Sequence, residues 1–420
     1  MKLTQILRDQ KQELKEEVKN KRIIKREAED HFKNILSSGL IKVISGVRRC
    51  GKSVFLYTLL KDKSFAYMNF DDERIIDVDT NQILSSFYEI YGKNFKFIFL
   101  DEIQNLDKWE LFVNRLKRQG FNLFITGSNA KLLSKELATH LTGRHLTVEL
   151  FPFSFREYLR AINFKEDVQT TKGIGLSKHE FRNYLTLSGF PEIIVEKEEP
   201  GIYIRELYRK IIERDIINRY NIAYKKTFKE IAMNLISNPG ISISYNKLKK
   251  QFGLGSEHTV KNYLSYLEEA YLILLINKFS YKPIEIEKSE KKVYLIDIGF
   301  INHLSLKFAG NYGHIYENLV ALDLLRQKSF NPNIEVYYWK NPQHEEVDFV
   351  VKEGLKVKQL IQVCYNLDNT DTKQREIRAL LKASKEIKCN NLLIITDDKE
   401  GEETIKNKKI NYLPLWKWLM

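Results

Sequence analysis

The chain has 420 residues, carries a formal net charge of +13 and contains three cysteines. This length exceeds what a single hydrophobic core accommodates, so two to four domains are expected. The positive charge favours an acidic partner, with nucleic acid as the leading candidate, although a lysine-rich solvated surface explains it equally well. The cysteines show neither metal-ligand nor disulfide spacing, and the sequence lacks a secretory signal and any apolar run of membrane-spanning length. A cytoplasmic protein without membrane contact is therefore expected.

The first 150 residues predict helices followed by a parallel sheet. Residues 1–38 are rich in lysine and glutamate and predict one or two solvated helices. From residue 41 onward, short apolar strand candidates alternate with helical stretches, and continuous apolar strands of this kind are covered by helices on both faces of an α/β sheet. The predicted strands are residues 41–44, 65–70, 95–100, 123–126 and 146–150.

A glycine-hinged loop follows the first strand and precedes a helix predicted at residues 53–60. It fits the pattern G-x-x-x-x-G-K-[ST], in which backbone N–H groups and the helix dipole face phosphate oxygens. Lys52 would place a positive charge on the β- and γ-phosphates, and the Ser53 hydroxyl would hold Mg²⁺. The sequence thus predicts a nucleotide site, with ATP and Mg²⁺, formed by Gly46, Val47, Arg48, Arg49, Cys50, Gly51, Lys52 and Ser53.

The third predicted strand ends in Asp101 and Glu102. At the carboxyl end of a buried strand, Asp101 is expected to help hold Mg²⁺, and Glu102 is expected to take a proton from the attacking water. An apolar run followed by two acids is by itself only a strand end. Its place after the phosphate loop makes a catalytic role the better interpretation.

The fourth strand ends in a polar tip that contains Ser128, and a helix predicted at residues 131–140 separates this tip from Arg144. In this order the parts resemble the AAA-type ATPases, which carry a polar sensor after the fourth strand and an arginine before the fifth. In that family the arginine reaches into a neighbouring subunit, so the resemblance implies catalytic roles for Ser128 and Arg144 and a homo-oligomer. The alternative for Arg144 is an arginine that caps a helix C-terminus.

Residues 151–222 predict a helical region. Within it, Ser188-Gly189-Phe190-Pro191 resembles the lid turn of archaeal ATPases of the origin-recognition and signal-transducing branches. The resemblance implies that Pro191 contributes to nucleotide binding by closing over adenine. An ordinary turn between two helices explains the same residues.

Residues 223–298 predict a winged helix, with two helices about the turn at residues 253–256. Strands at residues 272–278, 283–286 and 292–296 would form its wing. The helices present side chains suited to phosphate contact and limited base reading, so DNA is the expected partner and a protein–protein spacer is the alternative. The candidate DNA-binding residues are Lys247, Lys250, His258, Thr259, Lys261 and Asn262.

Residues 310–420 predict a separate α/β domain whose acids are spaced like a restriction-endonuclease core. Glu317 and Asp348 match the two carboxylates that such a core uses for Mg²⁺. Gln362 stands where the acid of the Glu-x-Lys motif is expected, and Cys364 stands where its lysine is expected. The site is therefore predicted to be degenerate, and a fold retained for binding or assembly is favoured over an active nuclease.

Over nearly its whole length the chain resembles archaeal and bacterial AAA-type ATPases that carry a C-terminal domain of unknown function with a nuclease-like fold. The resemblance implies an α/β P-loop fold, ATP hydrolysis and a link to DNA. The predicted domains are residues 1–38, 39–150, 151–222, 223–298 and 310–420. Two other functions stay open, namely a nucleotide-gated switch or scaffold with a protein partner and an ATP-regulated nuclease.

Overall fold

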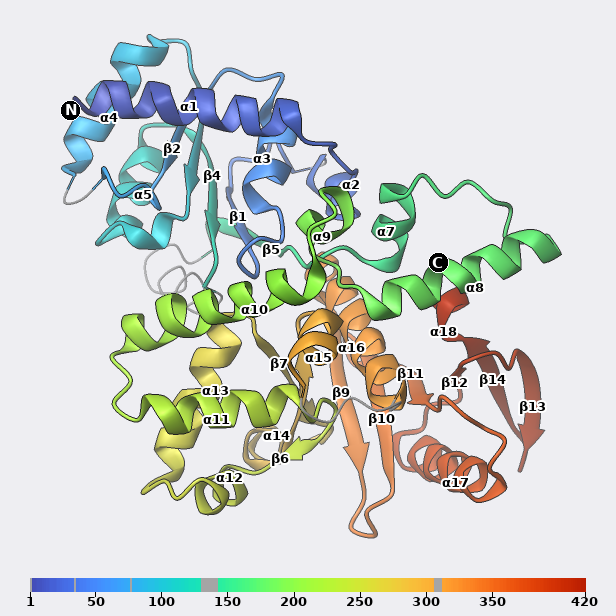
Figure 1. The fold of residues 1–420 in the computed structure, drawn as a ribbon. Coiled ribbons are helices and arrows are strands. Elements are labelled where there is room, and N and C mark those ends of the chain that lie inside the picture. The colour runs from blue at the N-terminus through green and yellow to red at the C-terminus, as the bar shows by residue number, and fades with distance from the viewer. Residues whose placement is uncertain (1, 34, 76–77, 130–142, 306–311) are drawn as a thin grey trace. The chain divides into compact units, whose positions relative to one another are not determined.

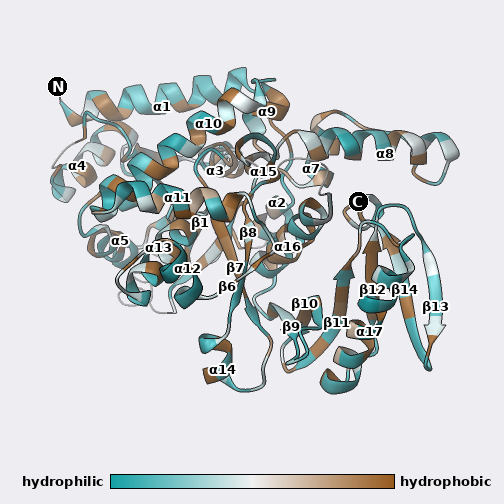
Figure 2. Cartoon of the chain, turned by 60° about the horizontal axis from the view of Figure 1, so that its bottom comes forward, coloured by the Kyte–Doolittle hydropathy of each residue, from teal (hydrophilic) through white to brown (hydrophobic). Residues whose placement is uncertain are grey.

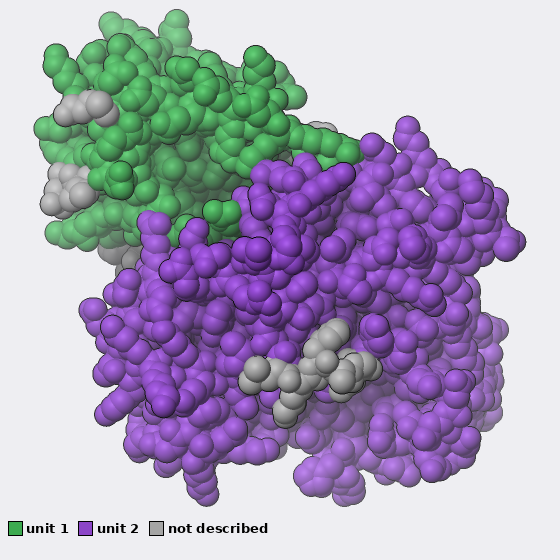
Figure 3. Space-filling view, in the orientation of Figure 1, with its two compact units in different colours: residues 1–152, 269–271 green, residues 153–268, 272–420 purple. Residues whose placement is uncertain are grey.

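The computed structural model of the chain describes residues 2–33, 35–75, 78–129, 143–305 and 312–420. It divides into two compact units, which Figure 3 shows in separate colours. The first unit comprises Met1–Pro152 together with Glu269–Tyr271, and the second comprises Phe153–Glu268 together with Leu272–Met420. Each unit is described by itself below.

The first unit is built on a parallel five-stranded sheet with the order β2-β3-β4-β1-β5 (Figure 1). This result confirms the predicted parallel α/β sheet, with strand ends that differ from the prediction by one or two residues. In this order β1 lies between β4 and β5, and β3 lies on the other side of β4. The strands are β1 (Ile41–Ser45), β2 (Phe65–Asn69), β3 (Phe97–Asp101), β4 (Asn122–Gly127) and β5 (His145–Glu149).

Helices cover this sheet because β1, β2, β3 and β4 are buried along nearly their whole length, so both faces of the sheet need apolar partners. One core combines Val43 and Leu100 of the strands with Phe87 of α4, and with Trp109 and Phe112 of α5. The predicted N-terminal helices are present as α1 and α2, and the helix expected after the phosphate loop is present as α3. The predicted helix at residues 131–140 lies outside the described residues. The helices of this unit are α1 (Leu3–Asn20), α2 (Ala28–Lys33), α3 (Lys52–Leu60), α4 (Thr80–Tyr91), η1 (Ile103–Asn105) and α5 (Trp109–Arg118).

The second unit contains a mixed nine-stranded sheet with the order β13-β14-β12-β11-β10-β9-β7-β8-β6. Strand β7 pairs in parallel with β9 at Asn277 and Tyr337, so one sheet runs through both predicted segments, residues 223–298 and 310–420. The boundaries drawn between these segments stay predictions. The strands are β6 (Ser242–Ile243), β7 (Ile273–Lys278), β8 (Lys291–Leu295), β9 (Ile334–Lys340), β10 (Glu346–Glu353), β11 (Lys356–Val363), β12 (Leu392–Thr396), β13 (Gly401–Ile405) and β14 (Lys408–Pro414).

The helices of the second unit include the predicted helical stretches and one that corrects the prediction. The strand predicted at residues 283–286 is wrong, because this segment is the helix α14. Pro283 stands at the first helical turn, where its missing N–H costs nothing, and Glu285 accepts hydrogen bonds from Lys282 and Ser280 at the helix start. The helices are α7 (Phe155–Ala161), α8 (Thr171–Thr186), α9 (Pro191–Val195), α10 (Pro200–Lys210), η2 (Ile211–Asn218), α11 (Lys225–Ile236), α12 (Tyr245–Gln251), α13 (Glu257–Glu269), α14 (Pro283–Lys288), α15 (Ile298–Leu304), α16 (Tyr312–Phe330), α17 (Thr370–Ile387) and α18 (Leu415–Trp418).

Hydropathy follows burial in both units. Figure 2 shows β12 in brown, whereas α1 is largely teal. All five residues of β12 are buried, whereas α1 buries only Ile6, Leu7, Gln10 and Leu14. None of the helices within the described ranges combines the length and the apolar character that a membrane crossing requires.

Candidate nucleotide site

The phosphate loop connects the end of β1 to the start of α3. Gly46 has a φ of 152°, and a Cβ atom built on it would lie 2.2 Å from the Leu150 carbonyl oxygen, so a side chain does not fit there. Gly51 caps α3 with a φ of 93°, and Arg49 also has a positive φ, of 67°. Two glycines and one left-handed arginine thus turn the chain back so that α3 begins directly at Lys52.

Lys52 is the buried cation of the site, with 4% of its side chain exposed. Its ammonium donates hydrogen bonds to the carbonyl oxygens of Gly46 and Val47, at 3.1 and 3.2 Å. It also pairs with Glu102 Oε1 at 3.4 Å. Burial by itself would lower the pKa of the Lys52 amine, but Glu102 and other neighbours raise that pKa above its ordinary value. Lys52 is therefore a charged donor at neutral pH.

Asp101 ends β3 and is almost completely buried. The Tyr67 hydroxyl donates to its Oδ2 at 3.2 Å, and the Thr126 hydroxyl donates to its Oδ1. Burial and the nearby charge of Glu102 raise the pKa of Asp101 to about 6, against hydrogen bonds from Thr126 and Ser53. A carboxylate beside a serine hydroxyl is a set of hard oxygen donors of the kind that Mg²⁺ prefers.

Glu102 follows with a φ of 48°, a left-handed conformation that is rare for a glutamate. Its backbone N–H donates to Thr126 Oγ1 at 2.9 Å. Its Oε2 accepts hydrogen bonds from Gln104 Nε2 at 2.5 Å and from the Ser128 N–H at 3.3 Å. Burial would raise the pKa of Glu102, but the Lys52 ammonium and these donors lower it to about 2. Glu102 is thus held ionised beside Lys52.

The first unit therefore brings together the phosphate loop, Asp101, Glu102 and Ser128. Ser128 is buried, and its hydroxyl accepts a weak hydrogen bond from Gln104 at 3.4 Å. Arg144 lies exposed in the turn before β5, where its carbonyl oxygen accepts the Ile41 N–H at 2.9 Å.

Pro191 lies in the second unit, at the first position of α9. The turn before it is fixed by Asp297, whose carboxylate accepts hydrogen bonds from the Ser188 hydroxyl at 2.6 Å and the Gly189 N–H at 2.7 Å. Burial raises the pKa of Asp297 to about 6, against these hydrogen bonds. Asp297 thus gives the turn a structural anchor, and the role of Pro191 toward adenine stays a prediction.

Three residues of this site were missed by sequence reasoning. Thr126 links Asp101 to Glu102, and Gln104 holds the Glu102 carboxylate. The buried Arg26 donates to the carbonyl oxygens of Cys50 and Phe151 and so supports the phosphate loop from the N-terminal segment. Thr126 and Gln104 stand within two residues of predicted site residues, which could have marked them. The position of Arg26, far upstream of the loop in sequence, gave no such indication.

A second charged cluster lies in the second unit, around Lys292 of β8. The Lys292 ammonium is 2.7 Å from Glu317 Oε1, 2.6 Å from Glu346 Oε1 and 2.9 Å from Asp348 Oδ1. Tyr294 also donates to Glu317 Oε1, at 2.7 Å. Burial raises the pKa of Asp348 to about 7, although Lys292 opposes this, and the carboxylates raise the pKa of Lys292 against burial. The sequence analysis predicted Glu317 and Asp348 but not their ion-pair partner Lys292.

The other two residues of the predicted degenerate site belong to the same region. Gln362 Oε1 accepts the Asp348 N–H at 3.3 Å, and Gln362 Nε2 donates to Glu376 at 2.7 Å. Cys364 is buried, and burial raises its thiol pKa to about 11. Across the described ranges, no group of three or more His, Cys, Asp and Glu side chains is arranged to hold a metal ion.

The candidate DNA-binding residues lie on α12 and α13. Four of them are exposed, and Thr259 and Asn262 are partly exposed. The Ser256 hydroxyl accepts the Thr259 N–H at 3.1 Å and caps the start of α13. The exposed residues are Lys247, Lys250, His258 and Lys261.

Comparisons with known families divide the chain into three matched segments. An AAA domain model matches residues 38–159, and two models of domains of unknown function, DUF8612 and DUF4143, match residues 178–310 and 312–418. This match confirms the AAA-type P-loop domain expected for the first part of the chain. The other two matches carry no functional description.

Curated relatives cover most of the chain. An uncharacterized protein of Methanocaldococcus jannaschii, MJ1544, is 42% identical over 399 residues, which are 90% of this chain and 88% of the relative. An uncharacterized protein of Haemophilus influenzae is 28% identical over 352 residues, 79% of this chain and 85% of its own length.

Solved structures are more distant. The Walker-type ATPase paby2304 of Pyrococcus abyssi has a TM-score of 0.41 and 14% identity, over 67% of this chain and 96% of its own. RuvB of Thermotoga maritima has a TM-score of 0.28 and 13% identity, over 64% of this chain and 92% of its own. At these TM-scores neither structure contributes to the assignment, which comes from the AAA match.

Proposed function

Because the chain belongs to the family of the uncharacterized Methanocaldococcus jannaschii protein MJ1544 and carries an AAA domain, we propose that it is a Mg²⁺-dependent ATPase whose nucleotide cycle controls contact with DNA. The observation that carries the proposal is the contact of Lys52 with Glu102 at the phosphate loop, next to the buried Asp101. Lys52 comes from the start of α3, whereas Asp101 and Glu102 come from the end of β3, about fifty residues later in the sequence. A chance glycine-rich turn would not assemble them.

The residues present fit a nucleotide with its metal. Lys52 turns its charge toward the β- and γ-phosphate oxygens, and Ser53 and Asp101 offer oxygen ligands. Mg²⁺, when bound there, offsets the charge that develops on the phosphates during transfer. Thr126 and Tyr67 keep the Asp101 carboxylate in place through their hydrogen bonds.

Glu102 acts as the proton acceptor for the attacking water. With Lys52 beside it, Glu102 has a pKa of about 2 and is a weak base. When Lys52 instead faces phosphate oxygens, Glu102 loses the strongest charge that lowers its pKa, so its basicity rises. Gln104 and Ser128 hold the carboxylate in position during this change. The lysine thus makes the base competent only when nucleotide is present.

The exposed Arg144 favours an assembly in which one subunit completes the site of the next. An arginine that stabilises the transferred phosphate from a neighbouring subunit requires an oligomer. Self-association with nucleotide is therefore part of the proposal, and so is an adenine contact by the turn before Pro191.

DNA contact is assigned to α12 and α13. The elements β6, α12, α13, β7 and β8 follow in the order of a winged helix, with α14 inserted between β7 and β8, and β8 pairs antiparallel with both β6 and β7. Exposed lysines and a histidine on the two helices suit phosphate contacts. A nucleotide-gated switch with a protein partner is the competing function, in which the same surface binds protein.

Two measurements test the proposal. The first is the rate of ATP hydrolysis in the presence and absence of DNA, and the second is the mass of the protein in solution in the presence and absence of ATP. We expect Mg²⁺-dependent turnover that increases with DNA and is abolished in Lys52→Ala. An ATP hydrolysis rate that DNA does not change, together with a nucleotide-dependent change in mass, would favour the nucleotide-gated switch with a protein partner. Turnover retained in Lys52→Ala would reject the assignment of the site.

DNA cleavage by the second unit is not expected. The Lys292 ammonium forms ion pairs with three carboxylates, those of Glu317, Glu346 and Asp348. A metal ion that binds these carboxylates would have to displace the ammonium. Incubation of plasmid DNA with Mg²⁺ or Mn²⁺ checks this expectation. Cleavage that disappears in Asp348→Ala would establish the nuclease alternative instead.

A further inference from the structure

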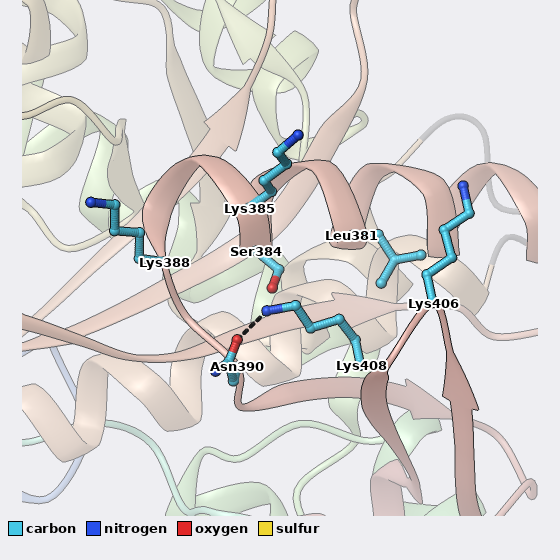
Figure 4. Close-up of a pocket in the computed structure, with 7 residues that line it drawn as sticks. All are labelled: Leu381, Ser384, Lys385, Lys388, Asn390, Lys406 and Lys408. Atoms are coloured by element: carbon cyan, nitrogen blue, oxygen red, sulfur yellow. Dashed lines mark hydrogen bonds between the residues drawn. The ribbon is translucent and has the colours of Figure 1, made fainter.

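A pocket of about 460 Å³ in the second unit is lined by four lysines (Figure 4). Lys385 and Lys388 come from the end of α17, and Lys406 and Lys408 come from the β13–β14 hairpin. Leu381, Ser384 and Asn390 complete the lining. Lys408 donates to Asn390, and within the described part of the chain none of the four lysines pairs with a carboxylate. Four lysines thus line one pocket without a carboxylate partner, and Figure 4 shows the Lys408 ammonium directed toward Asn390.

The backbone places two of these lysines at conformationally costly positions. Lys388 follows α17 with a φ of 61°, at a helix end where glycine is the usual residue. Lys406 and Asn407 form the two-residue turn of the hairpin with φ values of 50° and 60°, where Asn-Gly is preferred. Glycine or asparagine would adopt these positive φ values with less strain. The presence of lysine at these positions therefore indicates that its charge has a function.

An aromatic groove adjoins the lysine pocket. It has a volume of about 780 Å³ and shares Lys388 with the pocket. The Tyr281 side chain, 74% exposed, lies at this boundary, and its hydroxyl is 3.5 Å from the Ile387 carbonyl oxygen. Its ring meets Phe279 edge-on, with centroids 5.1 Å apart. Tyr281 is therefore a supported ring with a solvent-facing surface.

The groove extends the lysine-lined surface without adding net charge. Lys352 and Lys356 line it, together with the acids Glu287 and Glu335. Glu335 already pairs with Lys352 and accepts a hydrogen bond from the Tyr337 hydroxyl at 3.0 Å. Six lysines and two glutamates thus line the pocket and groove together. A positive path next to an exposed ring is the arrangement that single-stranded nucleic acid uses.

We propose that the lysine pocket binds the phosphate backbone of single-stranded nucleic acid and that Tyr281 stacks on a base of the same strand. Phosphates supply the anions that the four lysines lack, and unpaired bases are free to reach an aromatic face. This surface is separate from the helices α12 and α13. The proposal does not depend on ATP hydrolysis or on the DNA contact assigned to those helices.

The experiment measures binding of a labelled 30-nucleotide oligothymidine by fluorescence anisotropy, without nucleotide, at several salt concentrations. Two double variants remove the pocket charge: Lys385→Gln with Lys388→Gln, and Lys406→Asn with Asn407→Gly. The first variant removes two lysines and is expected to weaken binding about tenfold or more and to reduce the slope of log affinity against log salt by about 1.4. The second removes one lysine, so it is expected to weaken binding less and to reduce the slope by about 0.7. Tyr281→Ala is expected to weaken binding at least about fivefold.

The controls separate charge at the pocket from total charge and from folding. Lys93→Gln with Lys165→Gln removes two exposed lysines elsewhere and should leave the salt slope nearly unchanged. Lys406→Asn with Asn407→Gly installs the preferred turn, so its melting temperature should equal or exceed that of the wild type. Weaker binding in this variant therefore cannot come from unfolding.

Four results would overturn the proposal. The first three are wild-type affinity and slope in both pocket variants, an equal loss in the Lys93/Lys165 control, and a preference for a 30-base-pair duplex over the single strand. The fourth is displacement of the oligonucleotide by free inorganic phosphate at concentrations too low to act through ionic strength. That result would identify a site for small anions instead of a nucleic-acid backbone. ATP turnover without DNA should be normal in both pocket variants, so failure here is distinguishable from failure of the ATPase assignment.

Discussion

Replacement of Glu102 by glutamine is expected to separate nucleotide binding from hydrolysis in this protein. Glutamine keeps the shape of the side chain and can still accept hydrogen bonds from Gln104 and Ser128. It cannot take a proton from water, and it removes the charge that pairs with Lys52. We expect nucleotide binding to survive and turnover to fall about 10²- to 10⁴-fold, the usual contribution of a general base.

The same substitution has a measurable effect on stability. The environment lowers the pKa of Glu102 from 4.5 to about 2, which corresponds to a stabilisation of its charged form by about 3 kcal/mol. In Glu102→Gln that stabilisation is lost, and Lys52 stays buried against the neutral oxygens of Gly46 and Val47. The nucleotide-free variant should therefore melt at a lower temperature than the wild type.

ATP should restore much of this loss, because phosphate oxygens give Lys52 a new anionic partner. The increase in melting temperature on adding ATP is thus expected to be larger in Glu102→Gln than in the wild type. Phosphate release and differential scanning fluorimetry, with and without ATP and Mg²⁺, measure the two quantities. Turnover within about threefold of the wild type would refute the base assignment, and an unchanged ATP shift would refute the exchange of Lys52 partners.

Three further predictions concern other residues. Arg144→Ala should bind ATP as the wild type does but hydrolyse it about 10³-fold more slowly, as single-turnover assays on the assembled protein would show; wild-type turnover would exclude a finger role. Because the raised pKa of Asp101, about 6, keeps it protonated below that pH, Mg²⁺-dependent binding of a fluorescent nucleotide should weaken between pH 7 and 5, and the Mg²⁺-free component should not; equal pH dependence of both components would contradict this. Lys292→Met should lower the free energy of unfolding by about 3 to 5 kcal/mol, since three carboxylates lose their shared cation. Lys282→Met, which breaks the exposed pair with Glu285, should cost less than about 1 kcal/mol in the same urea titration, and equal costs would argue against a stabilising role of the cluster.

Local sequence was sufficient to predict the glycine-rich loop and most of the elements around it, and nucleotide binding at this loop stays a prediction. The phosphate loop depends on residues that are adjacent in the chain, because two glycines and one lysine at fixed spacing set both the turn and the charge. The buried strands could also be predicted from the sequence, because each is a short apolar run with polar residues at its ends. Asp101 and Glu102 could be found because the end of a buried strand is a position defined by sequence.

Tertiary structure decided the partners of these residues. Strand β4 lies between β1 and β3, so Thr126 reaches both Asp101 and Glu102, and only the sheet order reveals this. Arg26 reaches the phosphate loop from the connection between α1 and α2, in a segment that the sequence predicted only as solvated helices.

The second unit shows the same limit more strongly. The sequence placed Glu317 and Asp348 in one region and noted that Cys364 replaces the expected lysine. It could not show that Lys292 fills the cluster from β8, because the pairing of β7 with β9 joins two segments that sequence treats as separate. Residues that are adjacent in the sequence determine the conformation and charge of a loop, so a local pattern can predict them. Contacts between distant segments depend on how the whole unit packs, and a local sequence pattern carries no information on that packing.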